Sequence, residues 1–260
     1  MSVAQLLLYN ELREQIRACS ICWGVGKVLL GYDLVMCECL RQALCTFYLA
    51  ASNIPAKFKS YELKDYMYPE SPTFAKVLKY VEALEKATKK GHGLYLYGGP
   101  QSGRTFLACG VLKEAARRGF SVYFQTYGSL LSLMHHDDSD PRKSEVRRIT
   151  SSGDIDLVCI DNVSEVLEKL TNMKTTVLSG QPTHGAVGFL ENIISARALE
   201  SKPLLITGSV SMEEIGKRFE SLGTLMTSQF LEAKCDNHHQ VVKHQQRKRL
   251  EDIGWDQLGA

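Results

Sequence analysis

The chain has 260 residues, which is enough for one large domain or two small ones. Hydrophobic residues make up 44% and charged residues 23%, as in an ordinary globular protein with a full core. The formal net charge of +2 is too small to indicate a nucleic-acid partner, so any basic surface must be local. No apolar run approaches the roughly 18 residues of a membrane span, and the N-terminus lacks the features of a signal peptide. We therefore expect a cytoplasmic protein.

The N-terminal part combines a helix, a cysteine cluster and a turn-rich stretch. Apolar residues recur at roughly helical spacing over 3–18, which predicts an amphipathic helix. Five cysteines follow within 19–45. The proline-containing stretch 51–72 is predicted to be a linker with short elements. Residues 73–90 have a strong helical period, and Gly91 is a natural stop for that helix.

The remainder alternates between apolar strands and helices. The predicted strands are "GLYLYG", "FSVYFQTY", "DIDLVCIDN" and "KPLLITGS", and the predicted helices are "TFLACGVLKEAARRG", "GSLLSLMHH", "HGAVGFLENIISARALES" and "SMEEIGKRFESL". Ser211 and Glu214 form the pattern of a capping box at the start of the last helix. Such alternation predicts an α/β fold with a parallel sheet flanked by helices. Residues 137–153 and 171–185 do not fit the alternation and are predicted to be surface loops.

The cysteine spacing predicts a metal site. Cys19 and Cys22 form one tight pair, Cys37 and Cys39 form another, and fourteen residues separate the pairs. This spacing is typical of a zinc ribbon or knuckle, and four thiolates leave no open position, so the zinc would be structural. A disulfide pair and free core thiols are the alternatives. Cys45 is spare, and the isolated Cys109 and Cys159 are expected to be small core residues.

A glycine-rich loop follows the first predicted strand of the alternation. "GGPQSGRT" fits the pattern of a phosphate-binding loop, with an arginine where lysine is usual, between a strand and a helix. Backbone N–H groups in such loops hold phosphates, and the final hydroxyl binds Mg²⁺. The alternative is an ordinary strand–turn–helix glycine loop. The predicted nucleotide-binding residues are Gly98, Pro100, Gln101, Ser102, Gly103, Arg104 and Thr105.

The strand 156–161 ends in Asp161, the usual position of an acid that supports Mg²⁺. A second acid commonly follows and helps to activate water, but here the next residue is Asn162. An amide orients water without accepting its proton. The alternative is a buried strand that simply ends in aspartate.

These segments together resemble the DnaC/DnaI helicase-loader family and its IstB-like relatives, within the AAA+ ATPases. The resemblance covers most of the chain, from the N-terminal cysteines through "ASNIPAKFKSYELKDY" and "GLYLYGGPQSGRTFLA" to "FLENIISARALESKPLLITGS" and "IGKRFESLGTLMTSQF". It implies a small zinc-binding domain at 1–50, a linker at 51–72 and an AAA+ nucleotide-binding domain at 73–260. Similar proteins bind ATP and single-stranded DNA and deliver a replicative helicase, which their N-terminal domain grips.

The chain also departs from the family pattern. Arg104 replaces the loop lysine, Asn162 the second acid, and Ser209 the asparagine of the sensor phrase. The late phrase, at 225–230, lacks both usual arginines, whereas Arg197 stands where the family carries one. The resemblance assigns Asp161, Asn162, Ser209 and Arg197 to the catalytic group. Since ground-state binding and catalysis use different contacts, we predict ATP or ADP binding with Mg²⁺ and weak or absent hydrolysis, unless a partner supplies the missing groups.

Basic residues gather in 141–148 and 243–249, where they form either a nucleic-acid surface or a solvated face or tail. Tyr123, Phe124 and Tyr127 are candidates for base stacking or, alternatively, core residues.

The function predicted from the sequence is helicase loading or helicase control in DNA replication. The partners would be a replicative hexameric helicase, single-stranded DNA and further copies of the chain. Two alternatives stay open: a non-enzymatic adaptor or decoy that binds a helicase or its loader, and a transposition helper like IstB.

Overall fold

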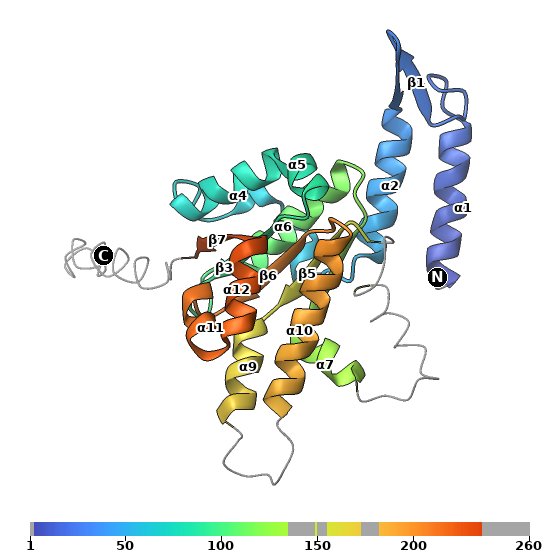
Figure 1. Cartoon of the computed structure of the whole chain (residues 1–260). Coiled ribbons are helices and arrows are strands. Elements are labelled where there is room, and N and C mark those ends of the chain that lie inside the picture. The colour runs from blue at the N-terminus through green and yellow to red at the C-terminus, as the bar shows by residue number, and fades with distance from the viewer. Residues whose placement is uncertain (1–2, 135–148, 150–154, 173–181, 236–260) are drawn as a thin grey trace, which may run out of the picture.

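The computed structural model describes residues 3–134, 149, 155–172 and 182–235. A small N-terminal module carries helix α1 (Val3–Arg17), strands β1 (Lys27–Leu30) and β2 (Asp33–Met36), and helix α2 (Glu38–Ala51). The two strands form an antiparallel hairpin, and α1 packs beside α2. Figure 1 shows that the hairpin projects away from the rest of the chain, while the far end of α2 reaches the α/β body. The sequence patterns predicted α1 but neither the hairpin nor α2.

The α/β body contains a five-stranded parallel sheet in the order β4-β5-β6-β3-β7. The strands are β3 (Gly93–Tyr97), β4 (Val122–Thr126), β5 (Leu157–Asp161), β6 (Leu204–Gly208) and β7 (Phe230–Lys234). The α/β fold with a parallel sheet is therefore confirmed. Of these five strands, only β7 was not predicted.

Helices cover both faces of this sheet. The elements are α3 (Ala56–Lys59), η1 (Leu63–Asp65), α4 (Pro72–Glu82), α5 (Leu84–Lys89), α6 (Arg104–Arg117), α7 (Tyr127–Met134), α9 (Val163–Asn172), α10 (Pro182–Leu199), α11 (Met212–Arg218) and α12 (Glu220–Gln229). Alternate strand residues enter two separate cores, as Leu94 and Tyr95 illustrate. One core packs against α2, α4, α5 and α6, and the other against α7 and α9 to α12. Among the described helices, none is long and apolar enough to cross a bilayer.

Local signals place several helix ends. Ser71 Oγ accepts the N–H of Phe74 at the start of α4, and Ser211 forms the predicted capping box with Glu214. A single helix was predicted over 73–90. The structure instead has two helices, α4 and α5, which meet at Ala83. The predicted loop 171–185 is helical at both of its ends, in α9 and α10. Most of the other predicted loop, 137–153, lies outside the described residues.

The stretch 51–72, predicted as a linker, packs against the α/β body. Ile54, Leu63 and Tyr66 are buried in the core beside α6. Lys113, itself buried, donates from Nζ to the carbonyl oxygens of Phe58 (2.6 Å) and Lys59 (2.7 Å) and to that of Tyr61. One α6 side chain therefore anchors this stretch through three carbonyl groups.

Candidate functional sites

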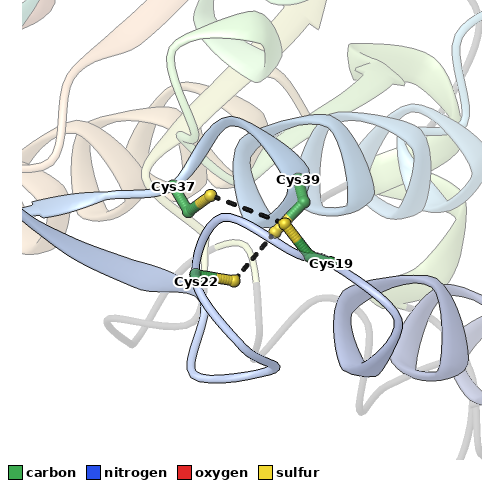
Figure 2. A group of neighbouring side chains, drawn as sticks. All are labelled: Cys19, Cys22, Cys37 and Cys39. Carbon is green, nitrogen blue, oxygen red and sulfur yellow. Dashed lines mark hydrogen bonds between the residues drawn. The ribbon is translucent and has the colours of Figure 1, made fainter.

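The four predicted zinc ligands converge at the base of the hairpin. Cys19 and Cys22 lie on the loop after α1, while Cys37 precedes α2 and Cys39 lies in its first turn. Figure 2 shows their sulfur atoms gathered around one point. The Sγ atoms of Cys19 and Cys37 are 4.0 Å apart, those of Cys22 and Cys39 are 3.4 Å apart, and all four lie within 4.8 Å of one another. Zn–S bonds of about 2.3 Å in a tetrahedron place sulfurs about 3.8 Å apart, so the cluster fits zinc.

The electrostatics of the cluster agree with this geometry. The backbone N–H of Gly26 donates to the Cys22 sulfur at 3.2 Å. Backbone N–H groups of Cys22 and Ile21 lower the pKa of Cys19 to about 6. The pKa of Cys39 is raised by burial and by the neighbouring thiols. A divalent cation at the centre would remove that opposition to ionisation. No disulfide joins the cysteines, and Cys109 and Cys159 are buried core residues as predicted.

The glycine loop between β3 and α6 has the backbone of an open anion cradle. Gly103 has φ of 86°, and a Cβ on Gly98 would lie 2.1 Å from the carbonyl oxygen of Cys235. The N-cap residue of α6 is Gly103, which has no side chain to accept from the first N–H groups of the helix, so these groups suit an anion. Ser102 Oγ is buried without a hydrogen-bond partner among the described residues. A phosphate oxygen would satisfy that hydroxyl.

Thr105, the last residue of the loop motif, meets Asp161 from the end of β5. Thr105 Oγ1 donates to Asp161 Oδ1 at 3.0 Å, and Thr207 Oγ1, from β6, donates to the same oxygen at 2.6 Å. Burial raises the pKa of Asp161, although both hydroxyls partly counteract it. Because Mg²⁺ prefers oxygen ligands and would stabilise the carboxylate, Thr105 and Asp161 fit the metal of a bound Mg–nucleotide. Thr207 is a contributor that the sequence patterns did not indicate.

Asn162 and Ser209 lie next to this centre. Asn162 has φ of 61°, a left-handed conformation that asparagine adopts more readily than most residues, and its N–H donates to Thr207 Oγ1 at 3.0 Å. Ser209 Oγ is 3.1 Å from Ser164 Oγ, in the first turn of α9. The carboxyl ends of β5 and β6 therefore bring both predicted residues close to Asp161.

The guanidinium of Arg104 is paired with an acid that sequence reasoning missed. Arg104 Nη2 lies 2.7 Å from Glu165 Oε1, with the arginine side chain 9% exposed. Arg104 Nη1 is buried and has no partner among the described residues. The only sequence signal for Glu165 is an acid in the first turn of the helix after the Asp161 strand.

Arg197 was predicted to belong to the catalytic group, but in the structure its side chain contacts backbone carbonyl groups and not the glycine loop. The side chain is buried and donates to the carbonyl oxygens of Ile149, Ile155, Asp156 and Pro203. Ile155 and Asp156 precede β5 and Pro203 precedes β6, so these carbonyl groups lie at the amino-terminal ends of the strands, whereas the glycine loop follows the carboxyl end of β3. Burial lowers the pKa of Arg197 to about 10. Arg197 therefore links the segments that lead into β5 and β6.

A cavity of about 330 Å³ adjoins the loop where Gln101, Ser102 and Gly103 meet the stretch 51–72. Its aromatic lining comes from Tyr61, Tyr66, Tyr68 and Phe106. The cavity is large enough and apolar enough for part of a planar base. Pro100 and Gln101 are exposed at the outer side of the loop.

Of the predicted nucleic-acid features, the aromatic residues are core: Tyr123, Phe124 and Tyr127 are buried. The basic segments 141–148 and 243–249 lie outside the described residues. The structure instead shows a lysine groove of about 470 Å³ between α4, α5 and β7, which the sequence patterns did not indicate. Its basic lining residues are Lys76, Lys79, Lys86, Lys90 and His92.

The parallel sheet, the open glycine loop and the Thr105–Asp161 contact define a P-loop nucleotide-binding protein of the AAA+ type. The model of the family described as "IstB-like ATP binding protein" matches residues 24–187, and the chain belongs to this family. It is an AAA+ protein related to the helicase loaders and to IstB.

A curated relative matches the chain at low identity. The uncharacterized protein YqaM of Bacillus subtilis (strain 168) is 23% identical over 198 residues, which are 72% of this chain and 58% of YqaM. The chain thus spans little more than half the length of this curated relative.

Solved structures with the same fold include replication proteins. DnaI has a TM-score of 0.53 at 15% identity, with 71% of this chain and 92% of that chain covered. The DnaC helicase loader has a TM-score of 0.53 at 16% identity, with 70% and 99% covered. The replication initiator DnaA bound to AMPPCP and single-stranded DNA has a TM-score of 0.53 at 20% identity, with 76% and 56% covered. At such identities these likenesses establish the fold alone.

Proposed function

We propose that this protein is a nucleotide-dependent helicase loader or helicase regulator in DNA replication, with weak or absent hydrolysis. The observation that carries the proposal is the convergence of Thr105, Asp161 and Thr207 beside an open glycine loop. ATP or ADP would place its phosphates on residues 98–105 and its Mg²⁺ at Thr105 and Asp161. Bound Mg²⁺ would supply charge neutralisation for the phosphates.

The N-terminal module, residues 1–50, is the proposed helicase-binding part, with 73–260 as the nucleotide-binding domain. Zinc held by the four cysteines would stabilise a hairpin that projects from the α/β body. Large apolar side chains are exposed on and around this hairpin, as expected of a protein-binding surface. They are Ile21, Trp23, Val25, Leu29, Leu30, Tyr32 and Leu34.

Single-stranded DNA would bind the lysine groove through its phosphates. Four lysines line the groove, and Glu232 is the one acidic residue among the described residues that line it. The groove therefore carries net positive charge suited to a polyanion.

A non-enzymatic adaptor is the second candidate. It is favoured by the tie between Arg104 and Glu165 and by the absence of arginine from 225–230. Self-association and a role as a transposition helper, as in IstB, remain further proposals for the same fold.

The test of nucleotide binding is calorimetry with ATP and ADP, with and without Mg²⁺. Thr105→Ala should weaken Mg-dependent binding at least about tenfold, because a metal ligand and an Asp161 contact are lost. Thr227→Ala, which removes a hydroxyl bonded only within α12, is the control and should leave affinity within about twofold. No uptake of either nucleotide by the wild type would refute the proposal.

Hydrolysis should be measured with and without a hexameric helicase and single-stranded DNA. Robust turnover by the pure protein would contradict weak hydrolysis, and no effect of a helicase on either binding or turnover would favour the adaptor.

DNA binding should be followed by the anisotropy of labelled oligo(dT) across salt concentrations. Replacing Lys79 and Lys86 together by glutamine should reduce the slope of log affinity against log salt by about 1.4, since each lost phosphate contact contributes about 0.7 on a single strand. Lys217→Gln, which breaks an exposed pair with Glu213, is the control. An unchanged slope would show that single-stranded DNA does not bind this groove. An acidic protein segment would then be the proposed ligand of the groove.

A further inference from the structure

The position where a nucleotide phosphate is expected to meet the loop arginine already holds a carboxylate. Arg104 is the first residue of α6, and Glu165 lies in the first turn of α9. Their side chains meet at 2.7 Å and are 9% and 28% exposed, so solvent screens this pair little on the arginine side. The second nitrogen, Nη1, has no partner within the described part of the chain. A guanidinium presents two parallel N–H groups to a phosphate, and here one of them is occupied.

We infer that Glu165 is a built-in competitor for the nucleotide phosphates at Arg104. The inference rests on the nucleotide binding proposed above and deepens it. Glu165 adds negative charge beside Asp161, whose pKa it helps to raise. A triphosphate entering the loop must therefore displace Glu165 from Arg104 or bind close to its charge, and both cost affinity. The nucleotide-free protein is stabilised by the pair, because a buried arginine without a partner would be costly.

The carboxylate of Glu165 is linked through hydrogen bonds of Ser164 to Ser209, the residue at the sensor position. Glu165 Oε2 accepts from Ser164 Oγ at 3.3 Å, and Ser164 Oγ lies 3.1 Å from Ser209 Oγ. The N–H of Ser209 donates to the same Ser164 oxygen at 2.5 Å. Moving Glu165 would disturb this hydrogen-bonded group at the end of β6. The Arg104–Glu165 pair thus couples nucleotide binding in the glycine loop to the hydrogen bonds at the start of α9.

The test is calorimetry of ATP–Mg and ADP–Mg binding to the full chain and its Glu165→Gln variant. Glutamine retains a hydrogen-bond acceptor for Arg104 but removes the charge. We expect ATP–Mg to bind about tenfold more tightly to the variant, which is about 1.4 kcal/mol, with a smaller gain for ADP–Mg. Glu168→Gln, one turn along α9 and paired with Arg218 at 3.4 Å, is the matched control and should stay within about twofold.

A double-mutant cycle with Arg104→Lys shows whether the effect acts through the arginine. Lysine is a point charge without the fork, so the gain from Glu165→Gln should shrink in the lysine background. The rise in Tm on adding ATP–Mg provides a second measurement, and it should be larger for Glu165→Gln than for wild type.

The outcomes separate this inference from the proposed function. Weaker or unchanged binding by Glu165→Gln, with wild-type binding intact, overturns the inference and leaves nucleotide binding standing. Binding by the variant but not by the wild type supports the inference and corrects the proposal for the native chain. If neither protein takes up nucleotide, both fail.

Discussion

The four-cysteine cluster and the glycine-loop site are both arranged to hold a ligand, but they are assembled differently. The cysteines come from two short segments within 21 residues, at the base of a hairpin. The loop site joins Thr105 from the first turn of α6, Asp161 from the end of β5 and Thr207 from β6. The first is expected to depend on its metal for folding, whereas the second depends on the sheet. Substitutions in the two sites are therefore expected to differ in the size of their effect and in how much of the chain they affect.

The largest effect is expected at the cysteines. Cys37→Ser should abolish stoichiometric zinc, as measured by native mass spectrometry, and unfold the N-terminal module, because structural zinc contributes roughly 10 kcal/mol or more. Nucleotide affinity should change less than about twofold if the two regions are independent. Cys45→Ser, outside the cluster, is the control. Retained zinc would contradict the assignment, and lost nucleotide binding would show that the regions are coupled.

A smaller effect is expected at Arg197, which contacts the amino-terminal ends of β5 and β6. Arg197→Met keeps much of the apolar stem but removes the donors to four carbonyl groups, so we expect a loss of about 3 kcal/mol in urea unfolding. Arg218→Met, at a more exposed ion pair, should cost less than about 0.5 kcal/mol. Nucleotide affinity of the folded Arg197 variant should be unchanged. Normal stability with weaker nucleotide binding would instead support the assignment of Arg197 to the nucleotide site.

The smallest expected change in stability is at Asp161, and it has the opposite sign. Its folded pKa lies above the ordinary value because of burial, so the folded state loses stability as pH rises through the unfolded pKa toward the folded one. Asp161→Asn should therefore raise the Tm of the nucleotide-free protein at neutral pH, and the gain should vanish at about pH 3. The same variant should weaken Mg-dependent nucleotide binding, as followed by calorimetry.

Asp156 offers a matched control for this sign. Burial opposes its ionisation, but Lys202 and the Ser121 donors lower its pKa below the usual value. Asp156 thus contributes stability that is present above the unfolded pKa and lost as pH falls through the folded pKa. Asp156→Asn should lower the Tm at neutral pH, whereas its effect should disappear in acid. A fall in Tm for both variants would show that Asp161 is not strained by burial.

The sequence by itself determined the features that depend on local spacing. Two cysteine pairs, a glycine loop before a helix and a run of apolar residues ending in Asp161 each carry their information within a few residues. Strand and helix periods likewise placed most elements of the α/β body. The hairpin was missed because its strands are short and largely exposed, without the alternation that a half-buried strand shows.

Only the tertiary structure decided which distant side chains meet. The order of the sheet brings Thr207 to Asp161 and Arg197 to the amino-terminal ends of β5 and β6, and no local period contains that order. The Arg104–Glu165 pair depends on how α6 and α9 leave the carboxyl ends of β3 and β5. The lysine groove requires α4 and α5 to lie against β7. Backbone geometry fixes what neighbours along the chain do, whereas the packing of whole elements fixes contacts between residues tens of positions apart.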